Sequence, residues 1–126
     1  MRLRKLLSIA VLAVSLPAFA EKPEHCPGVN AINAIKYRLS NVKNENGTWT
    51  MTSGIRQFDT KEAWMLNVYG IKAENQNEAF EKALTSIKSL TYLQGPEEEM
   101  FNTWSCAYRT NDGYVAIAMT LPSPLK

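Results

Sequence analysis

The stretch from Asn75 to Leu93 constrains the fold more than any other part of the sequence, because it predicts one amphipathic helix. Five apolar residues fall at i, i+3, i+4, i+7 and i+10 and make one stripe on a helical period: Phe80, Ala83, Leu84, Ile87 and Leu90. Asn75 can cap the first turn, with Glu78 at the reciprocal position of a capping box. A single helix cannot bury such a stripe alone, so the chain needs a second layer.

The first twenty residues have the organisation of an export signal. Three basic residues precede an apolar run over residues 6–16, and Ala18 to Ala20 has the small-x-small form of a cleavage site. The apolar run is about half of the roughly 20 residues that a membrane span needs, so we expect no retained anchor. We therefore expect a signal peptide at 1–20 and a single small domain at 21–126 that is periplasmic or secreted.

The charge of the mature chain differs from that of the precursor. Three of the 14 basic residues leave with the signal and none of the 12 acidic ones does, which leaves 11 basic against 12 acidic residues. A chain without a basic patch gives no reason to expect a nucleic-acid partner. The remaining 106 residues are enough for one domain with a modest core.

Cys26 and Cys106 are the only two cysteines. In an oxidising compartment we expect them to form one disulfide. Closing so long a loop contributes about 4 kcal/mol on the loop-entropy estimate. A pair of free thiols is the alternative.

Strand-like segments on both sides of the helix predict the second layer. Residues 37–43 predict a first strand and residues 48–53 a second, joined through Asn44–Gly47, where a two-residue and a four-residue turn are both open. Residues 63–71 are apolar on both faces, as in a central strand. A short helix over residues 28–36 precedes them, behind Pro27.

The last two strands predict their own register. With Asp112-Gly113 as a two-residue turn, Cys106 lies opposite Met119 and Tyr108 opposite Ile117, all on one apolar face under the helices.

Gly95-Pro96 predicts a break after the long helix, and residues 97–99 a solvated acidic loop. The expected fold class is α+β, an antiparallel sheet of about five strands with two helices packed on one face, in the order α-β-β-β-α-β-β.

His25 is the only histidine, so a Ser–His–Asp or Cys–His site would have to use it. It lies in a polar lead without a visible partner, and we expect no enzyme and no catalytic residue. One histidine and two cysteines do not supply the three or four ligands of a zinc site, so no metal site is expected.

His25-Cys26-Pro27 has the form of a short haem-responsive motif, in which thiolate or imidazole binds iron. A cysteine in a disulfide gives no thiolate, and Cys-Pro is also a common way to open a helix, so both interpretations stay open. Trp49, Trp64 and Tyr69 lie on predicted strands, where they either fill the core or border a pocket for a flat apolar ligand. These three and His25 are the candidate ligand-binding residues.

Tyrosines and methionines are further possible iron ligands, although on strands such residues usually serve the core or a sheet face. They are Tyr37, Tyr69, Tyr92, Tyr108, Tyr114, Met51, Met65 and Met119.

Five features of the layout occur together. Cys26-Pro27 follows the signal, a tryptophan-containing strand covers residues 63–69, an asparagine-rich segment enters the helix at 74–79, Gly95-Pro96 follows it, and a second cysteine stands in the penultimate strand. This layout resembles a family of small exported proteins of unknown function from intracellular Gram-negative bacteria that includes hemin-binding-type proteins.

The resemblance implies an exported binding protein for haem or another flat apolar ligand. The alternative is a secreted or periplasmic interaction protein, an inhibitor or effector without enzymatic activity that acts on a host or envelope protein.

Overall fold

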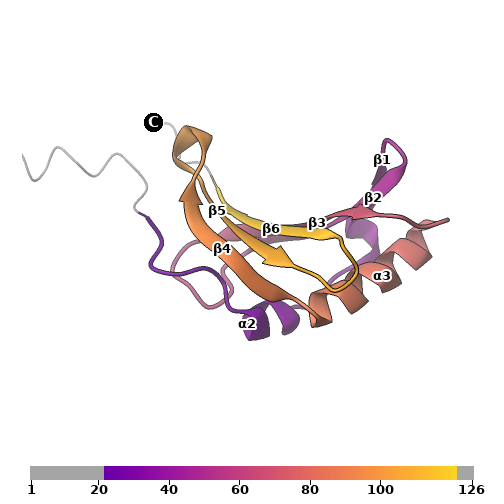
Figure 1. Cartoon of the computed structure of the whole chain (residues 1–126), viewed down its shortest axis with the longest axis horizontal. Helices are drawn as coiled ribbons and strands as arrows, with labels where there is room; N and C mark the ends of the chain where they lie inside the picture. The colour runs from indigo at the N-terminus through magenta and orange to yellow at the C-terminus, as the bar shows by residue number, and fades with distance from the viewer. Residues whose placement is uncertain (1–21, 122–126) are drawn as a thin grey trace, which may run out of the picture.

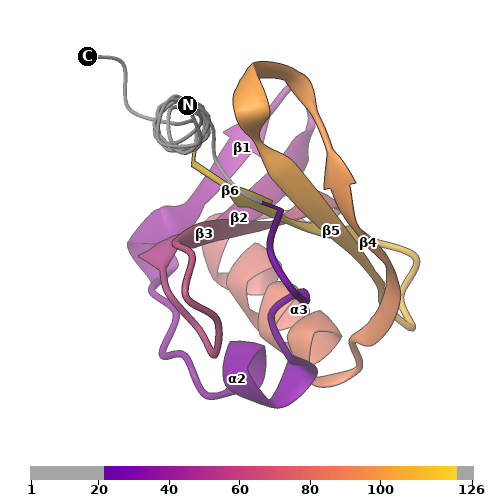
Figure 2. The ribbon, with the colours of Figure 1, turned by 90° about the vertical axis from the view of Figure 1, so that its left-hand side faces the viewer.

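The computed structural model describes residues 22–121; the predicted signal peptide lies outside the described residues. The two α-helices of these described residues lie on one side of a six-stranded antiparallel sheet with the strand order β1-β2-β3-β6-β5-β4 (Figure 1 and Figure 2). The elements in chain order are α2 (Val29–Asn33), the 3-10 turn η1 (Leu39–Asn41), β1 (Val42–Glu45), β2 (Thr48–Arg56), β3 (Trp64–Ile71), α3 (Gln76–Lys88), β4 (Thr91–Glu98), the 3-10 turn η2 (Met100–Asn102), β5 (Trp104–Arg109) and β6 (Val115–Thr120).

The expected α+β class is confirmed, while the strand count and order were wrong. The sheet has six strands rather than five, and the order of helices and strands is α-β-β-β-α-β-β-β. The difference arises after Lys88, where α3 ends and the chain becomes the edge strand β4. Pro96, which predicted a break, fits inside β4 because an edge strand has one side without ladder hydrogen bonds.

The stripe of α3 packs against the sheet as expected. Ala79, Ala83 and Ile87 are buried, and Phe80 and Leu84 pack at the border of the same core. The side chain of Asn75 accepts a hydrogen bond from the Glu78 backbone N–H at 2.8 Å, which confirms the cap. The Glu78 carboxylate accepts from the backbone N–H of Glu74, one residue before the expected position.

The first hairpin uses the shorter of the two turns that the sequence left open. Asn46 and Gly47 have φ angles of 56° and 95°, the left-handed pair that a two-residue turn requires, and Val42 pairs with Met51. Tyr37 was expected in the first strand and lies before it instead. It is buried, and its hydroxyl donates a hydrogen bond to the Ile32 carbonyl at 2.9 Å.

The last hairpin differs by one residue from the expected register. Cys106 pairs with Ala118 and Tyr108 with Ala116, because five residues rather than the expected two lie between β5 and β6. The side chain of Thr110 fastens this loop, since its hydroxyl lies 3.0 Å from both the N–H and the carbonyl of Tyr114.

A one-residue slip turns a strand over, so the two faces of β6 are exchanged relative to the expectation. Ala116 and Ala118 face the helices, and both are fully buried. Ile117 and Met119 face the opposite side, which neither α2 nor α3 covers.

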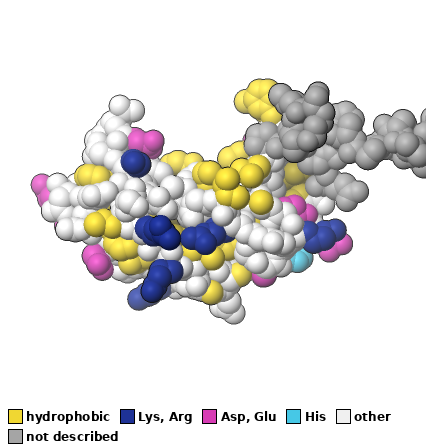
Figure 3. Space-filling view, turned by 180° about the vertical axis from the view of Figure 1, so that it is seen from behind, with side chains coloured by type: hydrophobic (Ala, Val, Ile, Leu, Met, Phe, Trp, Pro, Cys, Tyr) yellow, Lys and Arg dark blue, Asp and Glu magenta, His cyan; other side chains and the backbone are white. Residues whose placement is uncertain are grey.

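This second side of the sheet, the open face, is bounded by raised ends. The β1–β2 hairpin rises at one end and the β4–β5 connection at the other, both away from the helices (Figure 1 and Figure 2). Seen from behind, apolar side chains gather on the surface between them (Figure 3).

Candidate ligand-binding site

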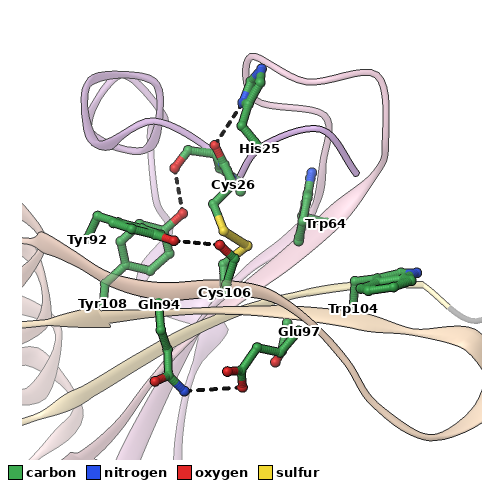
Figure 4. Close-up of a disulfide and its surroundings, with 12 residues drawn as sticks. His25, Cys26, Trp64, Tyr92, Gln94, Glu97, Trp104, Cys106 and Tyr108 are labelled. Atoms are coloured by element: carbon green, nitrogen blue, oxygen red, sulfur yellow. Dashed lines mark hydrogen bonds between the residues drawn. A yellow bond between two sulfur atoms is a disulfide. The ribbon is translucent and has the colours of Figure 1, made fainter. Parts of the chain in front are cut away.

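The expected disulfide between Cys26 and Cys106 is present. It fixes the N-terminal segment of residues 22–28, which we call the lead, to the sheet. The two Cα atoms are 5.9 Å apart across a sequence separation of 80 residues, and Cys106 is fully buried on the helix-covered side of β5. Figure 4 shows His25 and Cys26 on one side of the β4 and β5 ribbons, with Gln94 and Glu97 on the other. The bond therefore brings His25 close to the edge strand β4.

Two hydrogen bonds hold the chain directly after Cys26. The hydroxyl of Tyr108 donates to the Pro27 carbonyl, and the Gly28 N–H donates to Oδ1 of Asp59 at 3.0 Å. Burial raises the pKa of Tyr108 well above its usual value, and the nearby Asp59 and Tyr92 add to the rise. Tyr108 thus remains a neutral donor over the physiological range.

The imidazole of His25 is exposed, and one hydrogen bond defines its tautomer. Nδ1 lies 3.1 Å from the carbonyl oxygen of Cys26. A carbonyl can only accept, so Nδ1 carries the proton and Nε2 of the neutral ring keeps a free lone pair. A histidine held in this way through Nδ1 can bind a metal through Nε2.

A pocket of about 370 Å³ lies between the lead and β4. We call it the lead pocket; its lining includes His25, Pro27, Val29, Tyr92 and Pro96. Tyr92 is 51% exposed, and its hydroxyl donates to the carbonyl of Gly95. The lead pocket thus combines an imidazole, a phenol and apolar walls.

Gly95 allows β4 to approach the disulfide. Its φ is 123°, and a Cβ atom built there would lie 2.5 Å from the Ser105 carbonyl oxygen and 3.2 Å from Sγ of Cys26. Only glycine fits this position. The floor of the lead pocket therefore depends on this residue.

The four residues that the sequence selected do not meet at one place. Trp64 is fully buried, and its indole donates to Oγ1 of Thr60 at 2.6 Å. Trp49 is half-buried and donates to the Ala73 carbonyl at 3.1 Å. Neither lines the lead pocket.

Tyr69 lies on β3 between residues that face the helices, so its side chain points to the open face. Its hydroxyl accepts a hydrogen bond of 3.0 Å from Asn67. His25 alone of the four lines the lead pocket, and the ligand role of the other three stays a prediction.

Tyr92 is the residue that sequence reasoning did not select for the site. It was named only as a further possible iron ligand, whereas Tyr69 was selected, because residues 91–93 were assigned to the end of the helix. The β-branched and aromatic pair Thr91-Tyr92 was the available signal for a strand.

Among residues 22–121, no group of three or more His, Cys, Asp or Glu side chains is placed to hold a metal ion. No helix in the same range is both long and apolar enough to cross a membrane. Comparison of the chain with protein-family models, with curated proteins and with solved structures finds no significant match. The resemblance to the hemin-binding-type family therefore stays a prediction.

Proposed function

We propose that this protein is an exported binding module for haem or another flat, largely apolar ligand, which it holds in the lead pocket. The observation that carries the proposal is the tautomer of His25, whose Nε2 lone pair is free beside a pocket with apolar walls. Imidazole is a common axial ligand of haem iron, and the phenol of Tyr92 is a second candidate ligand group of a known type. The disulfide suits a periplasmic or secreted protein.

The disulfide determines which residue of the His25-Cys26-Pro27 motif can bind iron. Both sulfurs are bonded to each other, so Cys26 offers no thiolate to iron. The proposed ligation therefore runs through His25. Pro27 and Val29 serve as apolar wall for the ring system.

A hemin titration of the oxidised protein, followed by the Soret band, tests this proposal. We expect a saturable shift that is lost in His25→Ala and altered in shape or position in Tyr92→Phe. Tyr69→Phe is the matched control, because Tyr69 lies on the opposite face of the sheet. A titration without a saturable band contradicts haem binding, and a band that forms only after reduction assigns the iron to Cys26 instead.

A second candidate is an interaction protein, an inhibitor or effector that binds a host or envelope protein and has no enzymatic activity. It is favoured by Met100 and Phe101, which are 75% and 78% exposed at the raised β4–β5 end. Affinity capture from envelope or host extract tests it. A captured partner that Phe101→Ser no longer retains supports this function, and equal capture by both proteins contradicts it.

A further inference from the structure

Three of the five methionines line one pocket on the open face. Met51 is buried in the core, whereas Met65, Met100 and Met119 border a pocket of about 400 Å³ together with Glu99, Phe101 and others. We call this the methionine pocket. It lies on the side of the sheet opposite to the lead pocket, so it goes beyond the proposed function and stands independently of it.

The register of the sheet places two of the methionine residues side by side. Met65 on β3 and Met119 on β6 are direct partners across the two strands, and both point to the open face. Directly opposed residues have Cβ atoms about 4.5–5.5 Å apart, within reach of a shared ion for long side chains. Met100 reaches the same pocket from η2.

The polar groups that share the pocket are already engaged within the protein. The hydroxyl of Thr103 donates to the Met100 carbonyl at 2.7 Å, and Oγ1 of Thr120 accepts from the Trp104 N–H at 2.9 Å. Oε2 of Glu99 accepts from the Ser105 hydroxyl at 2.8 Å. The amide Nδ2 of Asn67, which also lines the pocket, donates to the Tyr69 hydroxyl at 3.0 Å. The three thioether sulfurs are therefore the most numerous ligand atoms in the pocket, beside one oxygen each of Glu99 and Asn67.

The turn that carries Met100 adopts an uncommon backbone. Phe101 and Asn102 have φ angles of 61° and 59°, a left-handed conformation that costs free energy for residues with a side chain. The Glu99 N–H closes the turn by donating to the Thr103 carbonyl at 2.8 Å. Strain of this kind is typical of positions where a side chain is presented for function.

We propose that Met65, Met100 and Met119 form a binding site for a Cu(I) ion. Thioethers are soft ligands that select Cu(I), whereas Mg²⁺, Ca²⁺ and Mn²⁺ prefer oxygen and Zn²⁺ prefers thiolate and imidazole. The Glu99 carboxylate in the lining supplies a negative charge near the cation. The ring of Phe101 lines the same pocket, and an aromatic face attracts a cation.

Nuclear magnetic resonance of protein labelled with [methyl-¹³C]methionine tests the site directly. Anaerobic addition of Cu(I) to the oxidised protein should shift the methyl signals of Met65, Met100 and Met119, with saturation at one ion per chain. The signal of Met51 is the internal control and should stay in place. Shifts spread equally over Met51, or no shift with excess Cu(I), overturn the proposal.

Competition with a chromophoric Cu(I) chelator gives the affinity of each variant. Met65→Leu and Met119→Leu should each weaken Cu(I) binding by roughly ten-fold or more, because a ligand is lost while the volume is kept. Met51→Leu should leave the affinity unchanged. Equal affinity in the triple Met→Leu variant overturns the site, whatever the outcome of the hemin titration.

Discussion

The hydroxyl of Ser86, in the buried face of α3, donates a 2.8 Å hydrogen bond to Oδ2 of Asp112 in the β5–β6 loop. This bond joins α3 to the loop between β5 and β6. Ser86→Ala leaves the carboxylate without its donor, and Asp112→Ala leaves a buried hydroxyl without its acceptor. We expect each change to lower the free energy of unfolding by about 1–3 kcal/mol in urea denaturation.

A double-mutant cycle separates this bond from the loss of packing. The double variant should lose less than the sum of the two single losses, since the second change removes a group whose partner is already absent. Thr85→Ala is the neighbouring control on the exposed side of α3 and should stay within about 0.5 kcal/mol of the wild type. Strict additivity of Ser86→Ala and Asp112→Ala contradicts the assigned bond.

The Cys26–Cys106 disulfide closes a loop with a sequence separation of 80 residues. Its removal in the double variant Cys26→Ser/Cys106→Ser restores the conformational freedom of the unfolded chain, at a cost of about 4 kcal/mol. We expect the melting temperature to fall by at least about 10 °C in a domain of this size. Calorimetry with and without reductant measures it.

The variant is its own control, because reductant should lower the melting temperature of the wild type and leave that of the double variant unchanged. A wild type that melts at the same temperature in both conditions would show that the lead is not held through these cysteines.

Gly95 and Gly113 both have positive φ angles, but only Gly95 is crowded. Gly113→Ala meets no atom within 4 Å and should lose about 1–2 kcal/mol of stability through backbone strain alone. Gly95→Ala adds a clash with the Ser105 carbonyl, so its loss should be clearly larger. Equal losses in urea denaturation contradict the close approach of β4 to the disulfide.

Local sequence patterns predicted the parts of the fold that depend on neighbouring residues. The stripe and cap of α3 are set by positions three and four residues apart. Asn46-Gly47 indicated the first hairpin, although the length of its turn stayed open until the structure showed it. The disulfide followed from the number of cysteines and the expected compartment. These features need no knowledge of distant contacts.

The register of the last hairpin depended on a distant contact. Asp112-Gly113 favours a two-residue turn by itself, but Asp112 bonds to Ser86 and Thr110 fastens a longer loop. The sequence pattern had placed Met119 under the helices. The one-residue shift in register brought it to the open face, beside Met65.

The candidate site was predictable only through His25. Tyr92 belongs to the lead pocket because β4 is a strand, and β4 was hidden by Gly95-Pro96, which ordinarily signals a break. Edge strands tolerate glycine and proline, so the composition of this segment did not reveal that β4 is a strand.

Two buried tyrosines predict an alkaline limit to stability. Burial raises the pKa of Tyr37 and of Tyr108 above the usual value of about 10, although Arg56 partly opposes the rise at Tyr37. Above about pH 10 the unfolded chain releases these two protons while the folded chain keeps them. Deprotonation then favours unfolding. The contribution of these two tyrosines to the free energy of unfolding is therefore constant below about pH 10 and falls above it.

Urea denaturation at about pH 8 and pH 11, bracketing the usual tyrosine pKa, measures this loss in each variant. Tyr37→Phe/Tyr108→Phe lacks both groups and should lose less stability between the two pH values than the wild type, although it starts lower because two hydroxyl hydrogen bonds are gone. Tyr69→Phe should keep the full alkaline loss. Lysine titration is common to all three proteins and cancels in the comparison, so an equal loss in the double variant would contradict the burial of these two phenols as the cause.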